Sequence, residues 1–291
     1  MPTNKLKNQI HLHFIVFIWG FTAILAALIS IDAIPLVWYR VMLASITLFI
    51  YFKIKKIKFK ISFDAFLRFL LGGILIALHW AAFFYAIKIS TISITLITMS
   101  SSAIFVALLD PLLSNKKFRL YELLLASIVI VGFIIIFKVE KGYTKGIISA
   151  LISSILLAFF SIFNSKNIQK YNAVHIAFYE LLTAFLFLSI VLLFSNSYSF
   201  DTLKLTKSDW LFLVILSTIC TAYPFVISTN LLKKMSPFTM VLTNNLEPVY
   251  GIILAVIIFG DKEKMSLQFY IGAAIIFGSV ILNGLLKARK N

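Results

Sequence analysis

The chain has 291 residues, of which 61% are hydrophobic and only 13% are charged, and its mean hydropathy is +1.00. A soluble domain usually carries about 25% charged residues, so this composition excludes an ordinary soluble enzyme and predicts a membrane protein. The net charge of +16 would suit a nucleic-acid partner, but the basic residues are divided among short connections, so we expect no nucleic-acid partner.

Ten apolar segments follow one another along the chain, and each is about long enough to cross the hydrocarbon core, which takes roughly 20 helical residues. The connections are short, and the longest, residues 195–207, is too small to be a domain. We therefore predict an all-α polytopic membrane protein with ten transmembrane helices. The predicted spans are residues 10–30, 35–52, 66–87, 90–113, 120–137, 146–163, 173–194, 209–232, 237–259 and 266–286.

Basic residues are distributed unequally between the two sides that these spans define. Of the 27 Lys and Arg residues, 18 fall on the side of the N-terminus and eight on the other side. Cytoplasmic connections carry such an excess, so both termini are expected in the cytoplasm. The run KIKKIKFK at 53–60 is interpreted as a topology anchor that touches anionic membrane lipids. Short connections without an organelle signal favour a bacterial inner (plasma) membrane.

The ten spans repeat one five-span pattern. FYAIKISTISITL, which begins at Phe84, aligns with TNLLKKMSPFTMVL, which begins at Thr229, at a shift near 145. With a slightly different shift, ASIVIVG at 126–132 aligns with GAAIIFG at 272–278. An odd number of spans per copy forces opposite orientations, so we predict two inverted five-helix repeats, residues 10–137 and 146–286. In such folds the binding sites lie near the membrane midplane between the repeats.

Arg40 in the second span and Glu180 in the seventh are related by a shift of 140. Inversion places them toward opposite faces of the membrane, so they are not expected to touch. Arg40 is a candidate for attracting an anionic group, and a snorkelling interfacial arginine is the alternative. A function for Glu180 is left open. Gly132, Gly272 and Gly278 are interpreted as packing glycines.

His79 in the third span and Tyr223 in the eighth are expected to be hydrogen-bond partners of a bound solute. Histidine titrates near neutral pH, although hydrogen-bonded packing is the alternative for a lone histidine. Trp80 follows it, but successive helical residues point about 100° apart and cannot both face one cavity squarely. Trp80 or Trp19 is expected to give the cavity an aromatic wall, and Pro224 to act as a hinge.

Glu247 is the sharpest candidate, because a charge at the bilayer centre costs at least ~2.5–3.5 kcal/mol and usually faces a cavity or a partner. Pro248 follows it, removes a backbone donor and is expected to open the helix as a hinge. Asn244, Asn245 and Glu247 would then present amides and a carboxyl at one level. Glu247 is interpreted as a proton-coupling group or a contact for a cationic solute group, with structural hydrogen bonding as the alternative.

Several of these segments are similar to those of the drug/metabolite transporter superfamily, specifically its EamA-domain members, and the similarity covers nearly the whole chain as two EamA repeats. They are Trp19-Gly20, Arg40 after Pro35, FYAIKIS, LEPVYGIILAVIIFGDKE and the glycine-rich tenth span. Copy one departs from the pattern, with Ala103 where copy two has Pro248 and Lys116 where copy two has Asp261. The resemblance therefore does not predict the same hinge in both halves. It implies transport of small metabolites, often amino acids or other polar compounds and often outward.

We therefore predict a secondary active transporter of a small polar, amino-acid-like solute, with export as the expected direction and proton coupling as an open alternative. Alternating access would occur around a cavity between spans 1, 3, 4, 6, 8 and 9. The sequence has no phosphate loop, HExxH, paired Cys/His or GxSxG motif, so no cofactor, metal or enzymatic role is predicted. A membrane-embedded enzyme acting on lipid-type substrates and a non-transporting scaffold are the rivals. A monomer or a homodimer is expected.

Overall fold

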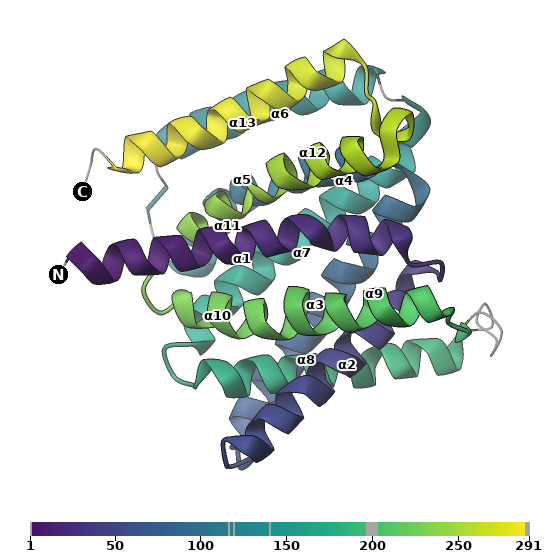
Figure 1. Ribbon diagram of the computed structural model, residues 1–291. Helices are drawn as coiled ribbons and strands as arrows, with labels where there is room; N and C mark the ends of the chain where they lie inside the picture. Colours follow the sequence, from purple (N-terminus) through teal and green to yellow (C-terminus); the bar gives the residue numbers. More distant parts are fainter. Residues whose placement is uncertain (1, 116, 119, 140, 196–202, 289–291) are drawn as a thin grey trace.

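The computed structural model describes residues 2–115, 117–118, 120–139, 141–195 and 203–288, and in them every regular element is helical (Figure 1). Three short elements interrupt the α-helices: η1 (Lys141–Tyr143), the π-helical η3 (Thr218–Ala222) and η4 (Gly260–Glu263). The α-helices are α1 (Pro2–Leu28), α2 (Ala33–Ile54), α3 (Phe63–Ile89), α4 (Ile92–Met99), α5 (Ser102–Leu113), α6 (Leu120–Val139), α7 (Thr144–Asn167), α8 (Ala173–Phe194), α9 (Lys207–Ser217), α10 (Tyr223–Leu231), α11 (Pro237–Asn244), α12 (Glu247–Phe259) and α13 (Leu267–Ala288).

Within the described residues, seven helical segments are long and apolar enough to cross a membrane. Shorter apolar stretches lie in α6 and α13, at Ser127–Ile136 and Leu267–Ser279. The prediction of an all-α polytopic membrane protein is confirmed, whereas the count of ten spans stays a prediction. The seven segments are Lys7–Leu28, Ala33–Ile54, Phe63–Ile89, Ile92–Leu113, Thr144–Asn167, Ala173–Phe194 and Lys207–Leu231.

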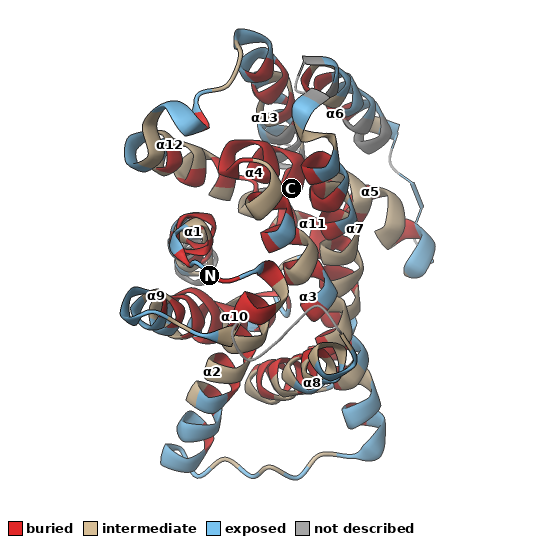
Figure 2. Ribbon diagram, turned by 90° about the vertical axis from the view of Figure 1, so that its right-hand side faces the viewer, coloured by how far each residue is buried: buried red, intermediate tan, exposed pale blue. Residues whose placement is uncertain are grey.

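The outside of the bundle is apolar, and polar side chains lie within it. Leu193 and Ile257 are among many large apolar side chains that are exposed, whereas Arg40 and Glu180 are fully buried. Figure 2 looks along the bundle and shows the buried faces turned toward its middle. Large exposed apolar surfaces are rare on soluble proteins, and buried charges are typical of membrane proteins with an internal cavity. This distribution is the one expected of a protein whose outer surface contacts membrane lipids.

The helix pairs follow the two halves of the chain: a contact between one helix of the first half and one of the second is matched by a contact between their counterparts in the other halves. At one edge α6 packs on α13, and at the opposite edge α2 packs on α8 (Figure 2). Between these edges, α3 of the first half packs on α7 of the second, and α9–α10 of the second half pack on α1 of the first. Likewise α1 packs on α12, and α7 packs on both α4 and α5.

Close contact between α6 and α13 depends on two glycines. A Cβ atom on Gly132 would lie 2.8 Å from Ile276 Cγ1, and one on Gly272 would lie 2.7 Å from Ile136 Cγ1. These reciprocal contacts pair Gly132 with Gly272, not with Gly278 as the sequence alignment has it. The interpretation of Gly278 as a packing glycine is wrong, because a Cβ atom there would meet no heavy atom within 4 Å.

Two of the predicted spans are broken at positions that touch each other. α4 ends at Met99 and α5 begins at Ser102, while α11 ends at Asn244 and α12 begins at Glu247. The first break needs no proline, since the hydroxyl of Ser101 donates to the Thr98 carbonyl at 2.7 Å and competes with regular helical bonding. The Asn245 side chain donates to the Ser100 carbonyl at 3.3 Å and joins the breaks. Both halves are thus interrupted, although Ala103 stands where the proline was expected.

Replacing Gly73 by Ala is expected to destabilise the protein by about 1–3 kcal/mol, because the added methyl overpacks the contact between α3 and α8. Its Cβ would lie 2.5 Å from the Glu180 carbonyl oxygen and 2.1 Å from Thr183 Oγ1. Thermal unfolding in detergent checks this. Gly278→Ala is the matched control and is expected to leave the midpoint unchanged or slightly raised. Equal midpoints for the two variants would contradict the packing account.

Candidate functional site

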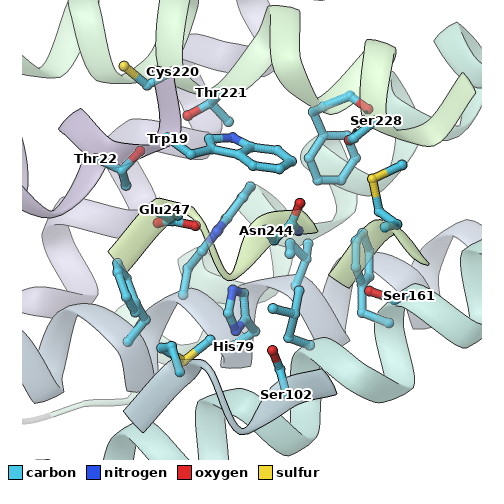
Figure 3. A pocket seen from close by; sticks show the side chains of 18 of the residues that line it. Trp19, Thr22, His79, Ser102, Ser161, Cys220, Thr221, Ser228, Asn244 and Glu247 are labelled. Carbon is cyan, nitrogen blue, oxygen red and sulfur yellow. Dashed lines mark hydrogen bonds between the residues drawn. The ribbon is translucent and has the colours of Figure 1, made fainter. Parts of the chain in front are cut away.

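A cavity of about 110 Å³ lies between the two halves of the chain (Figure 3). One water needs roughly 10–15 Å³ on this scale, so the cavity has room for a small solute. Its walls come from α1, α3, α4, α5, α7, η3, α10, α11 and α12, which belong to the spans predicted to form it. The second span was not among them, and α2 contributes Arg40.

The break between α11 and α12 places three polar side chains in the wall. Asn244 ends the first segment, Asn245 lies in the break, and Glu247 opens the second segment with Pro248 beside it in the first turn. All four residues line the cavity, and Figure 3 shows Asn244 and Glu247 on neighbouring parts of this wall. Across the described residues, burial and the charge of Arg40 act on the Glu247 carboxyl, and no hydrogen bond does. It is therefore available to a solute or a proton.

Arg40 reaches the cavity from α2 and is only 1% exposed. Its Nε donates to Thr221 Oγ1 at 2.6 Å, and its guanidinium carbon lies 4.0 Å from the centre of the Trp80 ring. The snorkelling alternative is wrong, because the guanidinium is held by these contacts deep inside the bundle. Its Nη1 is buried and has no hydrogen-bond partner among the described residues. An unsatisfied charged donor of this kind suits a ligand with an anionic group.

Arg40 and Glu247 act on each other electrostatically without pairing directly. Each feels the other's charge, but they form no ion pair in the described part of the chain. A buried charge is costly unless it is paired. The cavity therefore offers one cationic and one anionic position, each open to an opposite charge on a solute.

His79 and Trp80 of α3 both line the cavity. Both residues reach it although successive helical residues point about 100° apart, and the Arg40 guanidinium lies over the Trp80 ring. His79 Nδ1 lies 2.8 Å from Ser153 Oγ and 3.0 Å from the Ser153 carbonyl. These bonds fix the ring, and no described residue bonds its Nε2. Trp19 of α1 faces the cavity from another side (Figure 3).

The π-helical turn η3 decides which residues of the eighth span reach the cavity. The Thr221 hydroxyl donates to the Leu216 carbonyl five residues earlier, at 2.6 Å, and still accepts from Arg40. A π-turn inserts one extra residue and so rotates the following helix relative to a regular one. Phe225 lines the cavity as a result. Pro224 is buried in the first turn of α10 but does not line the cavity.

Tyr223 is not brought to the cavity. Its side chain is on the outside of the bundle, 40% exposed, and its hydroxyl lies 3.0 Å from His11 Nε2. The expectation that Tyr223 contacts the solute is therefore wrong. It assumed a regular helix, whereas the π-helical turn η3 rotates the helix that follows it. Glu180 also lies away from the cavity, where its Oε2 accepts from Asn164 at 2.9 Å.

A model of the EamA-like transporter family matches residues 10–138 and 144–285. The chain belongs to the EamA-like transporter family. No curated protein matches it significantly. Among solved structures, 27 chains match. One of them, a crystal structure with 16% sequence identity, covers 96% of this chain and 98% of its own with a TM-score of 0.70, which shows a shared fold.

Sequence reasoning missed several hydroxyl-bearing residues that line the cavity of this EamA-like transporter. Thr22 was detectable, because it lies three residues after Trp19 and therefore on the same helical face. Its Oγ1, like Asn244 Oδ1, is buried without a partner among the described residues. Within the described residues, no group of three His, Cys, Asp or Glu side chains is placed to hold a metal ion. The missed residues are Thr22, Ser161, Thr221, Ser228 and Thr229.

Tyr223→Phe is expected to leave solute transport by this EamA-like transporter within about twofold of wild type, because the phenol faces away from the cavity and an exposed hydrogen bond contributes little. The initial transport rate in proteoliposomes checks this. Ser228→Ala, at a cavity-lining position five residues further along α10, is the comparison and is expected to change the rate more. A larger loss for Tyr223→Phe would return Tyr223 to the site.

Proposed function

We propose that this chain is a secondary active transporter that exports small zwitterionic, amino-acid-like solutes by alternating access. The observation that carries the proposal is the presence of Arg40 and Glu247 in one cavity without an ion pair between them. An α-amino acid carries a carboxylate and an ammonium group that can satisfy both. Its direction of transport, outward, follows the resemblance to the family.

The contacts of the cavity suit such a solute. Arg40 Nη1 offers the carboxylate a charged hydrogen-bond donor, and the free Glu247 carboxyl offers the ammonium group a counter-charge. Trp19 and Trp80 supply aromatic faces for an apolar side chain or for a cationic group. The volume of about 110 Å³ limits the solute to a small one. Because one chain encloses the whole cavity, a monomer is sufficient, and a homodimer would hold two cavities.

Two inverted repeats of five spans are proposed as the framework, with α6 and α13 as the fifth and tenth spans. The exchanged helix pairs support this, as does the contact between Ser100 and Asn245, whose separation of 145 residues matches the repeat shift. Figure 1 shows both termini at the same end of the bundle, which an even number of spans requires. The basic run at 53–60 favours the cytoplasmic side of a bacterial inner membrane for this end.

The helix breaks are proposed to act as hinges. Pro248 and Pro224 each lie in the first turn of a half-helix, and Ser100 and Ser101 form the corresponding break in the first half. Freed backbone groups at membrane depth are tolerated where they line a cavity. Rocking of the repeats about these breaks would expose the cavity to one side of the membrane at a time.

Metabolite profiling of cells and medium tests the proposal. The wild-type chain and the empty host are compared at matched growth, and wild type is expected to enrich one class of amino-acid-like compounds in the medium. The class is then tested in proteoliposomes against its decarboxylated amine and its deaminated acid. Each analogue leaves one charge of the cavity unpaired, so the zwitterion is expected to be transported at least about tenfold better. Equal transport of all three would reject the zwitterion assignment, and no transport of any solute would reject the transporter function.

A further inference from the structure

A buried carboxylate joins the two halves of the chain at the end of the bundle away from the termini. Asp209, at the start of α9, is 1% exposed. Its oxygens accept from the backbone nitrogen and the hydroxyl of Ser30, both at 2.7 Å, at the far end of α1. They also accept from the backbone nitrogen and hydroxyl of Thr206, which caps α9. Asp209 thus ties the connection between α1 and α2 to the second half.

Glu263 makes a second link at the same end. It is 6% exposed, and its two carboxylate oxygens accept from the backbone nitrogens of Ile92 and Ser93, each at 2.9 Å. The Ser93 hydroxyl donates to the same carboxylate at 2.8 Å. These nitrogens belong to the first turn of α4, where the helix dipole favours a negative charge. A residue that follows α12 in the second half therefore holds the beginning of a broken helix in the first half.

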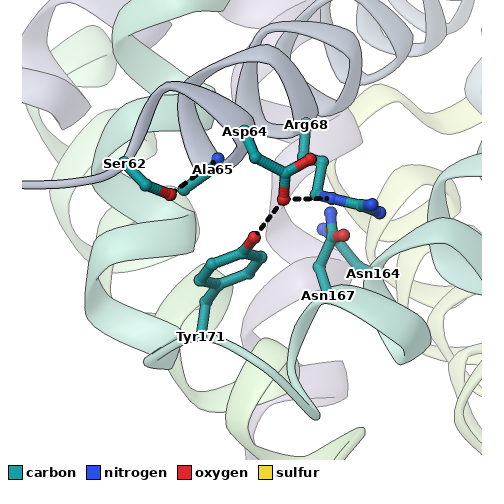
Figure 4. A network of polar contacts seen from close by, with 7 residues as sticks. All are labelled: Ser62, Asp64, Ala65, Arg68, Asn164, Asn167 and Tyr171. Carbon is teal, nitrogen blue, oxygen red and sulfur yellow. Dashed lines mark hydrogen bonds and ion pairs between the residues drawn. The ribbon is translucent and has the colours of Figure 1, made fainter.

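At the end that carries the termini, the corresponding carboxylate link is exposed. Asp64, at the start of α3, is the first-half counterpart of Asp209, and it accepts from the Tyr171 hydroxyl at 2.6 Å and from Arg68 Nε at 3.0 Å (Figure 4). Its side chain is 63% exposed, and the Arg68 bond stays within α3. No acidic residue occurs at 114–119, the segment that corresponds to the one containing Glu263.

We infer that Asp209 and Glu263 form a pair of latches that hold the end away from the termini closed, while the end with the termini opens more readily. The inference rests on the proposed alternating access and states which side is favoured at rest. Charge-assisted hydrogen bonds to buried carboxylates are strong, whereas exposed pairs contribute little. Opening the far end must separate Asp209 from Ser30 and Glu263 from α4. The bonds between the halves at the other end include the exposed contact between Asp64 and Tyr171 and three bonds of side chains to backbone carbonyls, and none of these uses a buried carboxylate. The three are His175 to Lys58, Tyr179 to Phe59 and Lys166 to Leu113.

Cys220 reports the side to which the cavity opens. It is the one cysteine of the chain, it is buried, and it lines the cavity. A membrane-impermeant maleimide is added to right-side-out and to inside-out vesicles, and a protease-sensitive C-terminal tag identifies the side of the termini. Wild type is expected to be labelled at least about tenfold faster from that side, because the labelling rate follows the open population.

Asp209→Asn and Glu263→Gln are expected to lower this ratio of rates at least about fivefold, since each loses its charged bonds. Ser30→Ala and Ser93→Ala remove hydroxyl partners without touching the cap of α9, and they should lower the ratio in the same direction if Asp209→Asn fails to fold. Asp64→Asn is the matched control and should not lower it.

Equal labelling of wild type from both sides would overturn the inference. An unchanged ratio in the latch variants would do the same, as would an equal fall in Asp64→Asn or the absence of labelling from either side in every variant. Labelling needs no solute, so its result is independent of the transport assay. Unequal rates without any solute transport would reject the proposed function and retain the latches.

Discussion

Arg40→Gln is expected to lower the transport efficiency, kcat/KM, for a zwitterionic solute by about 10- to 100-fold. A hydrogen bond to a charged group contributes about 1.5–3 kcal/mol, and 1.4 kcal/mol corresponds to a factor of ten. The glutamine keeps a donor near Thr221 but loses the positive charge, the stacking on Trp80 and the free Nη1 that the structure leaves without a partner. Initial rates in proteoliposomes, at solute concentrations below KM, measure the change.

The selectivity of the Arg40 variants separates a binding role from a structural one. Arg40→Lys retains the charge but not the planar fork, so an intermediate loss is expected. Thr221→Val removes the hydrogen-bond partner and leaves the guanidinium in place, so it should cost less than Arg40→Gln. Transport of a decarboxylated analogue should fall less than transport of the zwitterion. If both fall equally in Arg40→Gln, the residue supports the fold and does not read the carboxylate.

The positions of the spans and most of the cavity were accessible from the sequence, because hydropathy and the cost of intramembrane charge are local properties. Glu247, Asn244 and Asn245 line the cavity as expected. Pro248 lacks a backbone donor and so interrupts the helix next to them, and this effect is visible in the sequence. The break at Ser100 was not accessible. It depends on the Ser101 hydroxyl donating to a backbone carbonyl and on a hydrogen bond from Asn245, which belongs to the other half of the chain.

The direction in which a helical side chain points, and whether it is buried, were the other properties that could not be predicted from the sequence. Tyr223 was placed in the cavity on the assumption of a regular helix, and the π-turn at 218–222 turns Phe225 inward in its place. From the sequence, Arg40 could either bind an anionic group or extend to the membrane interface. Its contacts with Thr221 and Trp80 inside the bundle exclude the second alternative. The latches of Asp209 and Glu263 join residues more than 165 positions apart, and pattern reasoning has no local signal for such pairs.

Glu247→Gln is expected to reduce zwitterion transport by about 10- to 100-fold and to remove its dependence on pH. The carboxyl has no hydrogen-bond partner among the described residues, so it is free to exchange a proton for the ammonium group of the solute. Protonation removes its negative charge, so lowering the pH is expected to weaken solute binding in wild type and to leave the glutamine variant unchanged. Rates across a pH series, at equal amounts of inserted protein, measure both effects.

Glu180→Gln is the matched control, because it makes the same change at a second glutamate of the membrane region, one that is fully buried. Glu180 bonds Asn164 and lies outside the cavity, so its replacement is expected to alter thermal stability but to keep the rate and the pH profile within about twofold. Transport that survives Glu247→Gln with an unchanged pH profile would exclude Glu247 from proton coupling. A flat profile in Glu180→Gln would move the coupling group to Glu180, although Glu247 lines the cavity and Glu180 does not.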